Sequence, residues 1–332
     1  MNIVRTIWNR CAGFSLIILM LTVFIYPVQA QTSCDQCGAD IQGDYVVFDG
    51  NSYHKICYKT HIQLRCDHCG EVIDGKYNIS EGQNYHPSCY RENIQARCDI
   101  CGQPLSGEYY TDYWGNSFHV QHSHELPECS TCGRVICQEL TGGGFELSDG
   151  RYLCSLCEMT SVTDDYQIQS ALRYTRRILE GNFIRDLPTD IPVTLVDQKA
   201  LKRISNIYND SMRGFTDHNM STRNGVVISR DSHIYILSNL PRTMFRAVLA
   251  HELLHVYLFE RDLDLRSDIR EGFCNLGSAL VYQDVQSEFA RYQLENMQES
   301  PDPDYGAGYR KMSGLLYQKG WQLLLRDLAK IR

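Results

Sequence analysis

The sequence lacks an excess of basic residues. Its 332 residues include 32 lysines and arginines against 40 acidic residues, which gives a formal net charge of −8. A chain with no basic stripe cannot neutralise many phosphates, and this excludes nucleic acid as a main partner. The length is sufficient for two or more domains with hydrophobic cores, and the composition is ordinary for a globular protein.

The N-terminal apolar run is short for a membrane span. It extends from Phe14 to Tyr26, follows Arg5 and Arg10, and precedes the small residues Val28 and Ala30. This order is typical of a secretory signal peptide comprising the first thirty residues, with cleavage after Ala30. Its removal would change the net charge from −8 to −10, because it holds two arginines and no acids. We therefore expect an exported protein, periplasmic or extracellular, although an uncleaved signal anchor remains an alternative.

The fifteen cysteines repeat in a pattern that favours zinc over disulfides. Four CxxC pairs recur at a period of about 32 residues, and each is followed by a second pair of cysteine or histidine residues. A CxxC turn brings two thiolates to one metal, and the second pair completes a tetrahedron. The four predicted ligand sets are Cys34, Cys37, His54 and Cys57; Cys66, Cys69, His86 and Cys89; Cys98, Cys101, His119 and His122; and Cys129, Cys132, Cys154 and Cys157.

Alternating segments such as "GDYVVFDGNSY" between the pairs predict a β-hairpin in each copy. In the third set, His124 could replace either histidine. Cys11 falls in the signal segment, and Cys137 and Cys274 lie outside the sets, as buried thiols would. A disulfide scaffold is the alternative interpretation, but three of the four sets contain histidine, which a disulfide framework does not need.

The repeat resembles LIM domains, in which two such zinc modules are packed together. A LIM domain joins its two sites through two residues, whereas eight separate Cys57 from Cys66 and Cys89 from Cys98. The modules are therefore expected to be a run of half-LIM units. The resemblance implies that they bind another protein and carry no chemistry themselves.

The cysteine pattern stops after Cys157, and periodic segments follow. Helices are predicted over "TDDYQIQSALRYTRRILEGNF", "KALKRISNIYND" and "SNLPRTMFRAVLAHELLHVYLFE", the last capped by Ser238 or Asn239. "IPVTLVD" predicts a strand, and the segments 225–229 and 233–237 predict a hairpin that turns at 230–232. This arrangement favours a zincin-type peptidase domain, so the overall fold class is α+β, with small β-rich LIM-like modules preceding a gluzincin-like domain.

Two histidines one turn apart predict a second kind of metal site. His251 and His255 occupy positions i and i+4 of the predicted helix and can hold one zinc together. Glu252 lies beside them, where a general base would take a proton from an activated water. Ordinary helix histidines are the alternative, but the surrounding apolar residues would then bury unpaired polar groups.

A catalytic zinc takes three protein ligands and keeps a fourth position open. Glu271 lies sixteen residues beyond His255 at the start of the next predicted helix, an arrangement typical of glutamate zincins. Glu260, Asp264 and Asp268 are rival ligands in the same region.

The combination of zinc modules, "LAHELLHVYL" and "REGFCNLGSAL" resembles the plant LIM-domain peptidases of the DA-one family. Further similar segments are "SFHVQHSHE", "ELSDGRYLCSLC" and "DYGAGYRKM". The resemblance implies a peptidase in which Glu271 is the third zinc ligand. Members of that family are activated by ubiquitin, but this sequence shows no ubiquitin-interacting helices before the modules, and export would separate it from cytosolic ubiquitin.

The C-terminal segment supplies further candidates for substrate contact. Tyr305, Tyr309 or Arg310 could donate to the oxyanion of peptide hydrolysis, with simple packing as the alternative. The segment 233–240 could pair with an extended substrate as an edge strand, or belong to the sheet interior.

The sequence as a whole predicts an exported zinc metallopeptidase that acts on a protein substrate. It would bind one catalytic and about four structural zinc ions. The expected domains are a signal peptide (1–30), four LIM-like modules (34–160) and a zincin-type domain (161–332). A non-catalytic zinc-module adapter with a degenerate peptidase domain is the alternative.

Overall fold

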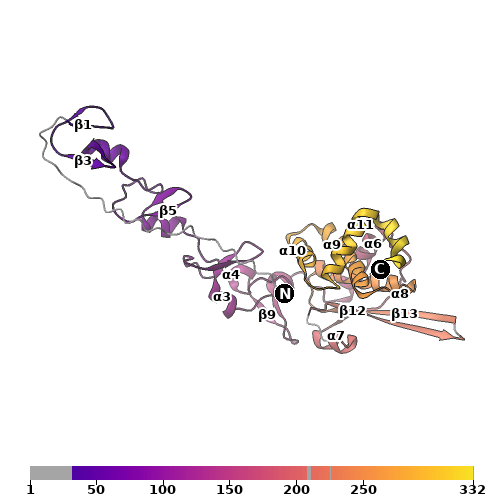
Figure 1. Cartoon of the computed structure of the whole chain (residues 1–332). Coiled ribbons are helices and arrows are strands. Elements are labelled where there is room, and N and C mark those ends of the chain that lie inside the picture. The colour runs from indigo at the N-terminus through magenta and orange to yellow at the C-terminus, as the bar shows by residue number, and fades with distance from the viewer. Residues whose placement is uncertain (1–31, 208–210, 225, 332) are drawn as a thin grey trace. The chain divides into compact units, whose positions relative to one another are not determined.

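The computed structural model describes residues 32–207, 211–224 and 226–331 (Figure 1). The predicted signal segment, Ala30 and Cys11 lie outside these residues. The chain forms two compact units, and the boundary falls inside the third cysteine module. Of the described residues, one unit contains 32–111 and 115–120, and the other contains Asp112–Trp114 and those from Gln121 onwards. Within the described ranges, no helix has the length and apolar character needed to cross a bilayer.

Each cysteine module is built on a two-stranded antiparallel hairpin, as the alternating segments predicted. The elements of the first module are β1 (Thr32–Ser33), β2 (Asp40–Ile41), β3 (Tyr45–Phe48), β4 (Asn51–His54), α1 (Lys55–Cys57) and η1 (Tyr58–Ile62). The second contains β5 (Asn78–Ser80), β6 (Gln83–Tyr85), α2 (Pro87–Cys89) and η2 (Tyr90–Ile94). The third contains β7 (Tyr109–Thr111), β8 (Ser117–His119) and α3 (Val120–Glu125), and the fourth α4 (Gln138–Thr141), β9 (Gly144–Glu146), β10 (Tyr152–Cys154) and α5 (Ser155–Glu158).

The first two modules have very small cores. The first buries Ile41 and Tyr53 beside Cys34, and the second buries Ile73 and Tyr85 in the same way. Units of this size bury too little apolar surface to offset the entropy of ordering their chains. Their folding therefore depends on an added cross-link, which a bound metal would provide.

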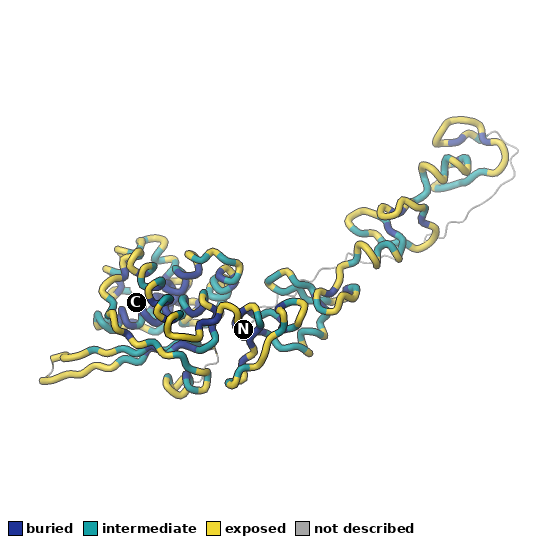
Figure 2. Tube along the Cα trace, turned by 180° about the vertical axis from the view of Figure 1, so that it is seen from behind, coloured by how far each residue is buried: buried dark blue, intermediate teal, exposed yellow. Residues whose placement is uncertain are grey.

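The C-terminal elements combine a small sheet with long helices (Figure 1). In chain order they are α6 (Asp165–Gly181), β11 (Val193–Val196), α7 (Gln198–Ser205), β12 (Gly214–Arg223), β13 (Val226–Leu237), α8 (Arg242–Glu260), α9 (Ser267–Val285), α10 (Glu288–Glu299), α11 (Gly306–Asp327) and η3 (Leu328–Lys330). The buried residues of this unit lie mainly in its helices, whereas the end of β12 and the beginning of β13 are exposed (Figure 2).

The predicted helix after the last cysteine module is confirmed as α6. Asp164 caps it, because its carboxylate accepts a hydrogen bond from the backbone N–H of Gln167. Ile168, Leu172 and Leu179 lie on the buried face of α6, which packs against α8. The amphipathic spacing of these residues therefore fixes which side of α6 faces the core.

The predicted hairpin turn at 230–232 is wrong. β13 continues through this segment as one strand, and Arg230 and Ser232 pair with Met220 and His218 of β12. The chain reverses after Arg223, where Asn224 has a φ of 51°. Asn224 is followed by glycine, and an Asn-Gly pair is the strongest short hairpin signal, so the correct turn was readable from the sequence.

The three-stranded sheet has the order β11-β13-β12, with β11 parallel and β12 antiparallel to β13. Residues Ile234–Leu237 of β13 pair with β11, and Ile234–Ile236 also pair with β12. Of the two alternatives for 233–240, the sheet interior is therefore correct, since both sides of its strand are occupied. The two edge strands of this sheet are β11 and β12.

The helix that carries His251 begins later than predicted. α8 starts at Arg242, directly after Pro241, and no side chain caps it. Neither Ser238 nor Asn239 is the N-cap, because the backbone turns at Asn239 with a φ of 60°. Pro241 suits this start, since its missing N–H would have no partner in the first turn.

Two glycines let α9 and α11 approach each other. A Cβ on Gly272 would lie 2.3 Å from the carbonyl oxygen of Gly308, and one on Gly308 would lie 2.2 Å from that of Asp268.

We expect Gly272→Ala to destabilise the protein by about 1–3 kcal/mol, as overpacking does. Thermal or urea unfolding measures this. Gly314→Ala is the matched control in α11, where a Cβ meets nothing within 4 Å. It should preserve or raise stability; equal losses in both variants would contradict the account.

Candidate metal centre

Two neighbouring helices bring three potential metal ligands together. His251 and His255 lie one turn apart on α8, and Glu271 lies in the second turn of α9. α8 and α9 pack closely, since a Cβ on Gly277 would lie 2.9 Å from the carbonyl oxygen of Ala250. The close contact points the Glu271 carboxylate at both imidazoles.

The ligand atoms form a nearly regular triangle. Nε2 of His251 and Nε2 of His255 are 3.1 Å apart. Oε2 of Glu271 lies 3.3 Å from the first and 3.4 Å from the second. Ligands about 2.1 Å from a tetrahedral zinc lie about 3.4 Å from one another. The three atoms thus have the spacing of zinc ligands.

The Glu271 carboxylate is suited to a metal in two further respects. Its Oε2 atom is buried and makes no hydrogen bond to the described chain. Burial opposes ionisation of Glu271, but the facing imidazoles of His251 and His255 lower its pKa well below the usual range. A buried, ionised oxygen without a hydrogen-bond donor is costly unless a cation binds it, so these residues fit a zinc ion.

The rival ligands lie outside this triangle. Asp268 pairs instead with Arg266 and Lys311, Asp264 is exposed, and Glu260 ends α8.

Asn275 holds the ring of His251, a role that the sequence analysis missed. Its Oδ1 lies 2.9 Å from Nδ1 of His251, and its Nδ2 donates to the carbonyl oxygen of Tyr305 at 2.9 Å. The amide orientation is thereby fixed, and Oδ1 accepts a hydrogen bond from Nδ1–H, which leaves Nε2 free to bind a metal. Asn275 lies one helical turn after Glu271, and this spacing was the available signal.

We expect Asn275→Ala to weaken zinc binding at this site by roughly 10- to 100-fold, because the ring of His251 loses its partner. Competition with a chelating dye measures the affinity. Asn275→Asp keeps an acceptor for Nδ1 and should retain most of the affinity. Equal affinity in the alanine variant and the unmodified protein would contradict this role.

Glu252 lies beside the triangle, and residues of strand β12 hold its side chain. Its Oε2 accepts a hydrogen bond from Oγ1 of Thr216 at 2.7 Å, and the residue is only 4% exposed. A Cβ on Gly214 would lie 2.5 Å from Oε1 of Glu252, so only glycine lets β12 approach this closely. The sequence analysis did not identify Thr216 and Gly214 as site residues, because they contact Glu252 from a different element, β12.

Of the three C-terminal candidates, the structure brings only Tyr305 to the site. Its ring stacks on His251 with a centroid distance of 6.0 Å. Burial, and then the carboxylates of Glu271 and Glu252, raise the pKa of Tyr305, so the phenol stays protonated. The candidate role of Tyr309 and Arg310 as oxyanion donors is corrected. Tyr309 is packed in the core, and Arg310 donates to the carbonyl oxygens of Gln298 and Ser300.

The cluster opens into a cavity of about 1100 Å³. Its lining includes His251, Glu252, His255, Glu271 and Tyr305. Cys274 lies behind this lining as a fully buried thiol, with its sulfur within 4.8 Å of the histidine nitrogens. A cavity of this size with converging polar groups is the usual form of a ligand site.

The four cysteine modules also gather their predicted ligands. The groups are Cys34, Cys37, His54 and Cys57; Cys66, Cys69, His86 and Cys89; Cys98, Cys101, His119 and His122; and Cys129, Cys132, Cys154 and Cys157. In each group the ligand atoms lie within 4.8 Å of one another. His124 is not a member of the third group.

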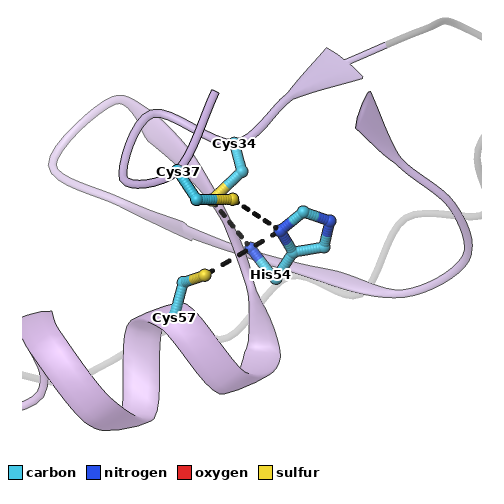
Figure 3. A group of neighbouring side chains, drawn as sticks. All are labelled: Cys34, Cys37, His54 and Cys57. Atoms are coloured by element: carbon cyan, nitrogen blue, oxygen red, sulfur yellow. Dashed lines mark hydrogen bonds between the residues drawn. The ribbon is translucent and has the colours of Figure 1, made fainter. Parts of the chain in front are cut away.

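Figure 3 shows the ligand group of the first module. The Cys37 and Cys57 sulfurs lie 3.4 and 3.9 Å from Nδ1 of His54. Zinc–sulfur and zinc–nitrogen distances of about 2.3 and 2.1 Å imply a separation of about 3.6 Å in a tetrahedron. Burial opposes ionisation of Cys34, yet backbone N–H donors, that of His54 among them, lower its pKa to about 6. The thiol is thus prepared to bind metal as a thiolate.

The outer nitrogens of three module histidines meet backbone carbonyl oxygens. Nε2 of His54 lies 3.2 Å from the oxygen of Asp40, Nε2 of His86 lies 3.0 Å from that of Val72, and the corresponding distance for His119 to Pro104 is 3.3 Å. A carbonyl oxygen only accepts hydrogen bonds, so Nε2 carries the proton. Nδ1, which faces the cysteine sulfurs, therefore keeps its lone pair for a metal.

The fourth module differs, because all four of its ligands are buried cysteines. Sγ of Cys132 and Sγ of Cys154 are 3.7 Å apart, the separation of two zinc-bound sulfurs and far beyond a disulfide bond. No disulfide is present among the described residues.

Metal analysis of the chain without its first thirty residues should find about five zinc ions, one for each cluster. Since Cys37, Cys69 and Cys101 are exposed, we expect a chelator to strip the first three modules before the enclosed fourth. A metal-sensitive dye follows the release, and thiol titration follows the freed cysteines. A zinc-free, disulfide-bonded protein would contradict this assignment.

A model of the DA1-like family, described as Protein DA1, matches residues 193–283. This segment runs from β11 into α9 and includes His251, Glu252, His255 and Glu271. The LIM domain-containing protein HDR3 of Oryza sativa subsp. japonica is 26% identical over 205 residues, which are 51% of this chain and 39% of that protein. Protein DA1 of Arabidopsis thaliana is 24% identical over 266 residues, which are 60% of this chain and 48% of that protein.

Protein DA1-related 2 of Arabidopsis thaliana is 26% identical over 213 residues, 53% of this chain and 38% of that protein. The chain thus spans less than half the length of these curated relatives. Similarity to DA1-like and LIM-domain proteins agrees with the Cys/His clusters, which have the composition and spacing of zinc sites.

Proposed function

We propose that the protein is a zinc metallopeptidase that hydrolyses peptide bonds in a protein substrate. One observation carries the proposal: His251, His255 and Glu271 form a triangle of ligand spacing at the wall of a cavity, with Glu252 beside them. Three protein ligands leave a fourth coordination position for water or substrate, as in catalytic rather than structural zinc sites. When bound, zinc would polarise the carbonyl and lower the pKa of a water.

The residues around the triangle suit this reaction. Glu252 is placed to take a proton from the attacking water and to pass it to the departing amine. Thr216 fixes the Glu252 carboxylate through the bond to Oε2. Tyr305 keeps its phenol proton and lines the cavity, so it can donate to the oxygen on which negative charge develops.

The edge strand supports an extended substrate. Gly214 and Thr216 of β12 line the cavity, and among the described strands β12 has a partner on one side only. Its free edge can pair with the backbone of a substrate chain, which supplies affinity without demanding a particular sequence.

The cellular setting belongs to the same proposal. The basic, apolar and small residues of the first thirty positions support export to the periplasm or the extracellular space. The half-LIM modules would then recognise or position a protein partner. The non-catalytic adapter is the competing function, and it would leave the Thr216–Glu252 arrangement without a role.

A comparison of protein cleavage tests the function. An extract is incubated with the zinc-loaded protein or with a Glu252→Gln variant, and newly formed N-termini are identified. Termini that arise only with the unmodified protein support a peptidase. Identical sets from both proteins would support the adapter.

A further inference from the structure

The cavity extends in two directions along α8 from the metal triangle. Met244 and Val248 lie two turns and one turn before Glu252, and both line the cavity. Leu258 and Phe259 line it beyond His255. A substrate lying across Glu252 therefore places its residues on either side of the reacting bond in different surroundings.

The fourth cysteine module contributes to the lining of the cavity. Ser130 and Thr131, which lie within its CxxC turn, line the cavity. The carbonyl oxygen of Thr131 accepts a hydrogen bond from Nε2 of Gln293 on α10 at 2.8 Å. Arg213 donates to the carbonyl oxygen of Ser130 at 3.5 Å. The metal-binding turn is thus joined to both walls of the cavity.

Aromatic residues hold the module in this place. Nε1 of Trp114 donates to the carbonyl oxygen of Cys132 at 3.1 Å, and the ring of Trp114 lies 5.2 Å from that of Tyr292 on α10. The Arg134 guanidinium lies over the Trp114 ring, 3.4 Å from its centroid. On a second side, Arg151 donates to the carbonyl oxygen of Ser238 at 3.1 Å. These contacts fix the turn on the rest of the unit.

The lining at this end combines apolar and polar side chains. Met212, Met244, Met297 and Val248 supply the apolar part, beside Ser130, Thr131 and Gln293, and Arg213 is the charged residue among the described residues there. The carboxylates of Asp262, Asp264 and Asp304 line the cavity elsewhere, beyond α8 and near the start of α9. Methionine side chains are flexible and polarisable, so they adapt to apolar groups of different shape.

We propose that the fourth cysteine module is a wall of the substrate cleft, and that with these methionines it forms a subsite for a large apolar side chain of the substrate. Leucine, methionine and phenylalanine are the residues it would take, next to the bond that is cut. The inference rests on the proposed peptidase function and adds a specificity to it. The zinc of this module would act by holding the wall, outside the reaction itself.

Peptide cleavage and peptide binding test the subsite. The zinc-loaded protein is given peptides of alanine, serine and glycine in which one position is varied among leucine, phenylalanine, aspartate and lysine. Burial of a large apolar side chain should raise kcat/KM on the order of tenfold to a hundredfold over the charged peptides. The same peptides are bound to the Glu252→Gln variant, which reports affinity without turnover.

Two substitutions probe the two walls. Met297→Glu places a charge in the subsite and should abolish the preference for apolar peptides. Gln293→Ala releases the zinc turn and should raise KM severalfold while kcat is retained. Met159→Glu, at a position 74% exposed, and Gln298→Ala, on the exposed side of α10, are the matched controls.

The outcomes separate the subsite from the reaction. A preference for charged peptides, or an unchanged profile in Met297→Glu and Gln293→Ala, would overturn the subsite. If no peptide is cut but apolar peptides still bind in a way that depends on Met297 and Gln293, the subsite stands and the proposed reaction fails.

Discussion

Replacing Glu252 by glutamine should lower kcat for protein cleavage by roughly 10²- to 10⁴-fold and leave the zinc content unchanged. Glutamine has the same shape and can still accept the hydrogen bond that Thr216 gives to Oε2. Its amide cannot take a proton from water at neutral pH, so only the proton transfer is lost. The measurement is the initial rate of cleavage, together with metal analysis of the same preparation.

Glu260→Gln on the same helix is the control. Glu260 ends α8 and is only partly buried, so this variant should keep both its zinc and its activity. Undiminished cleavage by Glu252→Gln would rule out Glu252 as the base. A loss of zinc in that variant would instead indicate that Glu252 supports the metal site.

The second large effect is expected for Glu271→Ala. This variant should lose one zinc ion per chain and, with it, all protein-cleaving activity. The remaining histidines provide two ligands, and a catalytic zinc is held by three. The metal count should fall from about five to about four, because the four cysteine clusters do not involve this residue. Metal analysis after gel filtration gives the count, and circular dichroism shows whether the helices remain.

Asp264→Ala and Asp268→Ala test the rival ligands. Both carboxylates lie outside the ligand triangle, so neither variant should lose zinc. If either lost the fifth zinc while Glu271→Ala retained it, the assignment of the third ligand would be wrong.

The sequence predicted the local parts of this protein well because local spacing determines them. The CxxC repeats predicted four clusters and their hairpins, and the apolar spacing around Ile168 predicted α6. The i, i+4 pair of His251 and His255 indicated a shared ligand face on α8. These features depend on residues close in the chain, where helix and strand periodicity fix the geometry.

The sequence failed where distant segments decide the outcome. The pairing of β13 with β11 joins residues about forty positions apart, such as Val193 and Ile234, so the sequence left open whether 233–240 forms an edge strand or lies inside the sheet. Tyr309 and Arg310 are adjacent to a plausible site in sequence, but α11 turns them away from it. Thr216 and Glu252 are 36 positions apart in the sequence, so no local pattern predicts their contact.

The absence of a side chain at Gly214 gives a way to compare related proteins. A methyl group there would meet the Glu252 carboxylate, so a relative with any larger residue must move either β12 or the carboxylate. A protein can therefore preserve both histidines and the glutamate of α8 and still lose the arrangement of these groups. The residue aligned with Gly214 therefore offers a criterion for whether a related protein keeps this arrangement, and the criterion does not depend on the metal ligands.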